Sequence, residues 1–152
     1  MIMEVFRISR EEYSKSLLTS GSANRWNLKG QLVLYAGSTR SLSSLELVVN
    51  KGAVKPSFQY KVMVISIADD DYLIKQIKIN ELPANWRSIA AYPDLQNIGA
   101  GWYNKRESLV LKIPSAIIPF EFNYIINTEH AEFVTKVSLV RTEDYFWDSR
   151  LL

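Results

Sequence analysis

Short apolar runs separated by polar turns predict about five β-strands. Residues 31–36 are nearly all apolar and stop at Gly37, which is typical of a buried strand. Over residues 58–67, apolar side chains first alternate with polar ones and then become continuous, which predicts a half-buried strand that goes deeper towards its end. The remaining strands are predicted over residues 73–79, 109–113 and 134–140.

Helical spacing follows the first of these strands. Leu42, Leu45 and Val49 recur at i, i+3 and i+7 after a serine-rich stretch suited to capping, which predicts an amphipathic helix. A further short helix could form over residues 11–18.

A later helix is predicted to begin near Asp94. It contains Gly99 and Gly101, each of which weakens a helix by roughly 1 kcal/mol relative to alanine. Their presence indicates that another part of the backbone approaches this helix closely. The mixed order of strands and helices predicts an α+β fold, with a mixed or antiparallel sheet core and flanking helices in a single domain over residues 1–152.

Composition excludes several classes of function. The 18 Lys and Arg residues against 16 Asp and Glu give a net charge of +2, too little for the basic surface that nucleic-acid binding needs. With no cysteine and one histidine, His130, the chain has no ligands for a structural zinc site and no thiol nucleophile. We expect no metal site, and a hydrogen-bonded structural role for His130.

The start of the chain carries charges where a secretory signal would be apolar, and no apolar run approaches the ~20 residues of a membrane span. These features predict a soluble cytoplasmic protein without a membrane partner. Aromatic residues make up 12% of the chain, so we expect some of them to line a pocket.

The polar loop before the first predicted strand holds Arg25 beside Trp26. A guanidinium offers a forked hydrogen-bond grip on phosphate or carboxylate, and small neighbouring residues let a ligand approach the backbone. The alternative is a surface loop in which Trp26 fills the core and Arg25 is solvated. Residue type alone favours that alternative.

Glu46 falls at the edge of the apolar stripe of the first helix. A partly buried carboxylate needs a partner, which makes Glu46 a candidate for chemistry. The alternative is a capping box, in which Ser43 begins the helix and Glu46 sits three residues later. A helix that begins near residues 38–41 would exclude the capping box and turn Glu46 inward.

Ser115 is the third candidate, because it follows a strand that ends at Pro114. Polar side chains at strand ends often point into a cleft, although a simple turn followed by a short buried segment explains the same residues. The acidic run 69–71 is interpreted as a solvated turn.

Nine short motifs run in order through almost the whole chain, in segments 4–8, 25–27, 34–36, 45–46, 82–87, 98–102, 110–115, 123–127 and 148–151. Through this ordered set the chain resembles RES-domain proteins, the toxin half of bacterial RES–Xre toxin–antitoxin pairs. The family name refers to Arg, Glu and Ser residues, which match Arg25, Glu46 and Ser115. The chain departs from the family pattern at Asn24, Asn50 and Thr128, where glycine, histidine and proline are common.

The resemblance implies a fold similar to ADP-ribosyltransferases and an enzyme that consumes NAD⁺ as its substrate, without a further cofactor. The implied catalytic residues are Arg25, Tyr35, Glu46 and Ser115, and the implied NAD⁺-binding residues are Arg7, Arg25, Tyr35 and Asn123. Side chains of the four catalytic candidates are predicted to line one pocket. An Xre-type helix-turn-helix antitoxin and a homodimer are the implied partners. The alternative is a non-catalytic module that binds a nucleotide or a protein.

Overall fold

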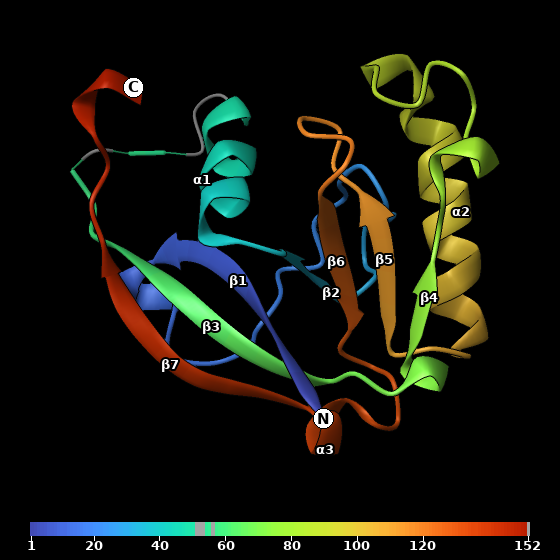
Figure 1. Cartoon of the computed structure of the whole chain (residues 1–152), viewed down its shortest axis with the longest axis horizontal. Coiled ribbons are helices and arrows are strands. Elements are labelled where there is room, and N and C mark those ends of the chain that lie inside the picture. The colour runs from blue at the N-terminus through green and yellow to red at the C-terminus, as the bar shows by residue number, and fades with distance from the viewer. Residues whose placement is uncertain (51–53, 56, 152) are drawn as a thin grey trace.

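The computed structural model describes residues 1–50, 54–55 and 57–151 (Figure 1). In these residues, seven strands form one sheet in the order β4-β5-β6-β2-β1-β3-β7. The strands are β1 (Ile2–Arg10), β2 (Val33–Gly37), β3 (Tyr60–Ala68), β4 (Ile74–Gln76), β5 (Val110–Pro114), β6 (Phe122–Asn127) and β7 (Val137–Tyr145). The α-helices are α1 (Arg40–Val49), α2 (Tyr92–Lys105) and α3 (Phe133–Lys136). Only the β4–β5 pair is parallel among them, so the fold is α+β with a mixed sheet, as predicted.

The sheet divides into two halves between β1 and β2. Nine residue pairs join β1 to β3 and five join β2 to β6, whereas β1 and β2 pair only at Phe6 and Gly37 in the described chain. Figure 1 shows the two halves diverging from this junction, with α1 between them. Strands that pair at one point and then separate leave side chains from both halves facing the same space.

Two predicted elements were wrong, the first because of a strand pairing distant in sequence and the second because of a local turn. Residues 134–140 do not form one strand: α3 ends at Lys136, and β7 begins at Val137, where pairing with Ile67 of β3 starts. The helix predicted over residues 11–18 is only a 3₁₀ turn, Glu11–Tyr13. Both the backbone N–H and the hydroxyl of Ser14 donate to the carbonyl of Glu11, which closes the turn.

Two strands were missed, and another is shorter than predicted. The charges of Glu4 and Arg7 interrupt the apolar run of β1, yet Val5, Phe6 and Ile8 are buried. Strand β6 was interpreted as a short buried segment, although it pairs with both β2 and β5. The strand predicted over residues 73–79 is limited to β4.

Helix α2 packs against the half of the sheet that contains β5 and β6, with Leu95 and Trp102 buried against Leu111 and Ile125. Gly99 lies on this helix where an added Cβ would come within 1.7 Å of the carbonyl oxygen of Trp26. The predicted close backbone approach is therefore confirmed at Gly99. It is wrong for Gly101, which has nothing within 4 Å of its Cβ position.

Within the described residues, no helix combines the length and the apolar character needed to cross a bilayer.

Candidate active site

A cavity of about 640 Å³ lies at the junction between the two halves of the sheet. Its volume falls within the range of roughly 300–1,000 Å³ that is usual for small-molecule sites. Five of the six residues predicted to act on substrate line it, and these are Arg7, Arg25, Tyr35, Glu46 and Asn123. The candidates therefore come together from β1, β2, β6, α1 and the loop before β2.

The start of α1 decides between the two interpretations of Glu46. Thr39 is the N-cap residue, and its side-chain oxygen accepts a hydrogen bond from the backbone N–H of Leu42. The helix thus begins before Ser43, so the capping-box alternative is wrong. The apolar stripe differs from the expected one, because Leu45 and Val49 are exposed. Glu46 instead belongs to the inward side of the helix.

One oxygen of Glu46 is held by the opposite half of the sheet. Its Oε1 accepts hydrogen bonds from the Ser115 hydroxyl at 2.8 Å and from the Asn123 side-chain amide at 2.7 Å. Among the residues that the structure describes, Oε2 has no hydrogen-bond partner. The carboxylate is therefore fixed in orientation through one oxygen, and the other is available to a ligand in the cavity.

Ser115 does not line the cavity, and the prediction that all four catalytic candidates do is wrong for this residue. It is fully buried, and its hydroxyl oxygen also accepts hydrogen bonds from the backbone N–H groups of Ile117 and Ile118 at 3.0 and 3.1 Å. The turn after Pro114 thus places Ser115 behind Glu46. Such a geometry orients the carboxylate and does not give Ser115 access to a substrate.

Arg7 brings a positive charge from β1 to the cavity. Its Nη1 donates to the backbone carbonyl of Tyr35 at 2.9 Å, which joins the two halves of the sheet a second time. Burial lowers the pKa of Arg7 because the charged guanidinium loses hydration. No carboxylate of the described chain lies within 4.0 Å of it. A desolvated cation without a counterion is an attractive site for an anionic ligand.

Arg25 lines the same cavity from the loop before β2. Its Nη1 donates to the carbonyl oxygens of Trp86 and Arg87 at 3.2 and 3.3 Å, and its guanidinium lies 4.7 Å from the centre of the Tyr92 ring. Arg25 is therefore not simply solvated, which corrects that part of the surface-loop alternative. Trp26 does fill the core, as that alternative stated, at 2% exposure.

Tyr35 is tied to the same loop through its hydroxyl group. The hydroxyl donates to Asn27 Oδ1 and accepts from the backbone N–H of Trp26. Burial raises the pKa of Tyr35, so the phenol stays protonated at neutral pH. The ring is left to line the cavity. Asn27, which sequence reasoning did not single out, is buried and donates to the carbonyls of Ser22 and Leu28.

The remaining singled-out residues have simpler places. His130 Nδ1 accepts a hydrogen bond from the backbone N–H of Glu132, the structural role expected for it. Residues 69–71 lie at an exposed turn before β4. Of the three departures from the family pattern, Asn24 and Asn50 line the cavity, whereas the Thr128 hydroxyl donates to the Leu32 carbonyl.

Comparison with known proteins gives one consistent result. Residues 4–148 match the RES domain. The chain is 32% identical over 153 residues to "Toxin Res" of Yersinia enterocolitica, covering 98% of this chain and 99% of that protein. It is 25% identical over 132 residues to "Prs ADP-ribosylating toxin" of Sphingobium sp., covering 86% and 81%.

A solved structure, the MbcT–MbcA toxin–antitoxin complex of M. tuberculosis, has the same fold. The match has a TM-score of 0.75 at 13% identity and covers 96% of this chain and 85% of that one. With the domain match over nearly its whole length, the chain belongs to the RES-domain family.

Proposed function

We propose that this chain is a toxin that cleaves the N-glycosidic bond between nicotinamide and ribose in NAD⁺. The observation that carries this proposal is the carboxylate of Glu46, which within the described residues is hydrogen-bonded through one oxygen only and lines the same cavity as Arg7, a cation without a nearby carboxylate. NAD⁺ matches this pair of charges. Its anionic pyrophosphate suits the arginine, and the positive charge that develops on its ribose when the glycosidic bond breaks suits the carboxylate.

Glu46 supplies the catalytic charge. When the glycosidic bond breaks, its electron pair leaves with nicotinamide, and positive charge develops on the ribose, as in glycoside hydrolysis. A fixed carboxylate near that ribose stabilises a charge that appears only in the transition state. Nicotinamide departs as a neutral molecule, so no strong general acid is needed. Ser115 and Asn123 act here as positioning residues, because both hold Oε1 of Glu46.

Arg7 and Arg25, which both line the cavity, bind the pyrophosphate through charge-assisted hydrogen bonds. Tyr35 offers its ring to the nicotinamide by stacking. Its hydroxyl has two partners in the Trp26–Asn27 loop and a raised pKa, so it takes no part in proton transfer.

The acceptor of the ADP-ribose decides the name of the reaction. Water gives ADP-ribose and a proton, inorganic phosphate gives ADP-ribose phosphate, and a protein side chain gives an ADP-ribosylated protein after it loses its proton. The name of the Sphingobium relative favours ADP-ribosyl transfer to a protein as the second candidate. All of these reactions share the departure of nicotinamide.

The first experiment is to incubate the purified chain with NAD⁺ in buffer alone, with inorganic phosphate, and with a bacterial lysate as a source of acceptor proteins, and to measure free nicotinamide. We expect release by the wild type, and a loss of at least about 10²-fold for Glu46→Gln with an unchanged circular-dichroism spectrum. Glu12→Gln is the control, because Glu12 is exposed and lies outside the cavity. Wild-type turnover by a folded Glu46→Gln protein would contradict the catalytic assignment. No release by the wild type above the Glu46→Gln background with any of these acceptors would favour the non-catalytic binding module.

A toxin of this kind needs to be neutralised. We propose an Xre-type helix-turn-helix antitoxin as the partner and a homodimeric toxin. The likeness to a toxin–antitoxin complex supports an antitoxin partner, without regard to its type. Production of the chain alone in a bacterium should arrest growth and lower cellular NAD⁺, and co-production of the antitoxin should restore both. Normal growth with unchanged NAD⁺, despite abundant folded protein, would contradict the proposal.

A further inference from the structure

Helix α1 carries Glu46 and is attached to the half of the sheet that contains β1. The two groups that hold Glu46 Oε1, Ser115 and Asn123, belong to the half that contains β5 and β6. The Ser43 hydroxyl donates to the carbonyl of Phe6 on β1 at 2.7 Å, in a buried position, and the Thr39 carbonyl of its own helix is a second, longer acceptor at 3.0 Å. Ser43 and Glu46 are three residues apart, so they lie on neighbouring positions of one helix face. The height and rotation of Glu46 above the cavity therefore depend on where Ser43 is anchored.

The anchor sits at the point where the two halves of the sheet meet. Phe6 pairs with Gly37, the single pair recorded between β1 and β2 in the described chain. An added Cβ at Gly37 would lie 2.6 Å from the Ser43 hydroxyl oxygen and 3.3 Å from its backbone nitrogen. The missing side chain at Gly37 is thus what lets α1 come close enough for Ser43 to reach the Phe6 carbonyl.

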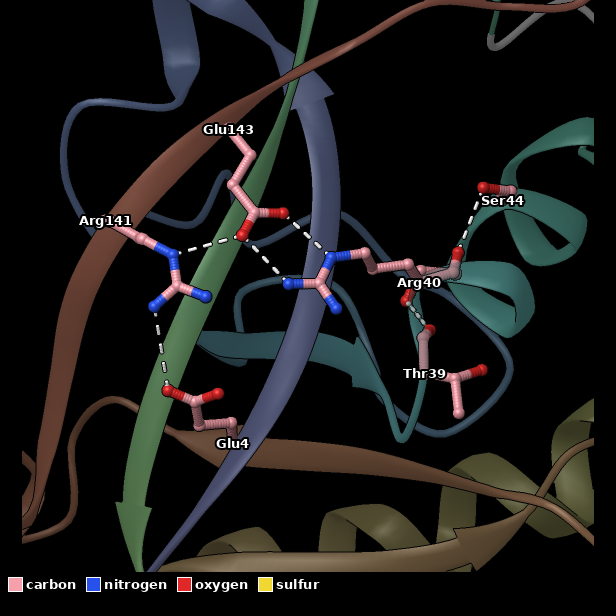
Figure 2. Close-up of polar contacts among 7 residues, drawn as sticks. Glu4, Thr39, Arg40, Ser44, Arg141 and Glu143 are labelled. Carbon is pink, nitrogen blue, oxygen red and sulfur yellow. Dashed lines mark hydrogen bonds and ion pairs between the residues drawn. The ribbon is translucent and has the colours of Figure 1, made fainter.

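A second set of contacts holds the same helix from the solvent side (Figure 2). Arg40 donates from Nε and Nη2 to the two carboxylate oxygens of Glu143 on β7, both at 2.8 Å, and Glu143 also accepts from Arg141. The Tyr145 hydroxyl donates to Ser44 at 2.7 Å. The Arg40 and Glu143 side chains are 46% and 29% exposed, so solvent screens their attraction.

We propose that Ser43 is a positioning residue for the reaction, which fixes Glu46 across the junction so that its free oxygen meets the substrate ribose. The inference rests on the proposed function of Glu46. The helix is held to one half of the sheet at Ser43, and its carboxylate is held to the other half by Ser115 and Asn123. With both ends fixed, the carboxylate has one position. Without the Ser43 bond, α1 can shift relative to β6.

The test is Ser43→Ala, measured as kcat and KM for nicotinamide release and as affinity for ADP-ribose by calorimetry. We expect kcat to fall at least about tenfold, since misplacement of a catalytic group by about 1 Å can cost up to 10²-fold. Affinity for ADP-ribose should stay within about twofold, because Arg7 and Arg25 lie on other elements. The matched control is Ser41→Ala, a serine on the exposed side of the same helix, which should leave both values unchanged.

Two further variants keep the inference testable if Ser43→Ala does not fold. Gly37→Ala pushes a methyl group against Ser43 and should also lower kcat. Arg40→Ala removes the exposed ion pair with Glu143 and the guanidinium that lies over the Phe6 ring, but it leaves the Ser43–Phe6 bond, so kcat should stay within about twofold. An unchanged kcat in a folded Ser43→Ala protein, or an equal loss in Arg40→Ala, would overturn the assignment. If the wild type releases no nicotinamide with water, phosphate or lysate proteins as the acceptor, the proposed function fails before any variant is compared.

Discussion

The contact between Gly99 and the Trp26 carbonyl can be tested by a single methyl group. In Gly99→Ala, the new Cβ would lie 1.7 Å from that oxygen and 2.8 Å from the carbonyl carbon, both main-chain atoms that no side-chain rotation can move. Since Cβ atoms do not approach other atoms closer than about 3.0 Å, the loop that carries Arg25 must move away from α2 by more than about 1 Å.

Overpacking of this kind costs about 1–3 kcal/mol of unfolding free energy. Urea denaturation measures this loss of free energy directly. For a chain of this length it corresponds to a fall in Tm of roughly 2–12 °C in thermal denaturation. The same movement displaces Arg25, so affinity for ADP-ribose should fall as well. Stability and ligand affinity are therefore expected to decline together in this variant.

Gly101→Ala is the matched control, on the same helix and two residues away. Its Cβ position has nothing within 4 Å, so alanine should gain helix propensity without a clash. We expect Gly101→Ala to raise the unfolding free energy by about 0.5–1 kcal/mol and to leave ADP-ribose affinity unchanged. A Gly99→Ala protein as stable as Gly101→Ala would refute the close approach of α2 to the Trp26 backbone.

Two further expectations concern charges. In calorimetry, Arg7→Gln should weaken ADP-ribose binding more than Arg25→Gln does, because the desolvated charge of Arg7 is screened less by solvent. Arg25→Lys should bind ADP-ribose only partly better than Arg25→Gln, because lysine restores the charge but not the forked hydrogen-bond geometry. Arg40 and Arg141 lower the pKa of Glu143 to about 2, so its contribution to stability is present above about pH 4.5 and is lost as the pH falls towards 2. In acid titrations followed by circular dichroism, Glu143→Gln should flatten that decline.

Local sequence patterns predicted the elements that local interactions decide. The strand before Gly37 and the later helix near Asp94 both exist, because their apolar positions lie within a few residues of one another. The helix that follows Gly37 also exists and is capped locally by Thr39, although Leu45 and Val49 of its predicted stripe are exposed. Strand β1 was missed because Arg7 looks like an interruption when only its neighbours are read. In the structure, the Arg7 side chain lines the cavity and donates to the backbone of β2, and neither contact can be read from the neighbouring residues in the sequence.

The site itself depends on separations that no local pattern spans. Glu46 meets Ser115 and Asn123 across 69 and 77 residues, and only the resemblance to a known family brought those residues together in advance. Even then, the role of Ser115 was misplaced, because a Pro-Ser pair at a strand end gives no sign of which way the turn folds. The bonds to Ile117 and Ile118 set that direction.

The division of the sheet explains why the site lies where it does. A sheet that paired β1 and β2 along their full length would fill the space between them with ladder hydrogen bonds and close the cavity. Instead, the Arg7 side chain donates to the backbone of Tyr35 and takes the place of main-chain pairing beyond the Phe6–Gly37 pair, while Ser43 holds α1 to Phe6. Arg7 therefore joins the halves of the fold, and Ser43 sets where α1 lies above the cavity. Substitution of Arg7 should weaken binding and substitution of Ser43 should lower kcat before either abolishes folding, because the strands of each half keep their own ladders.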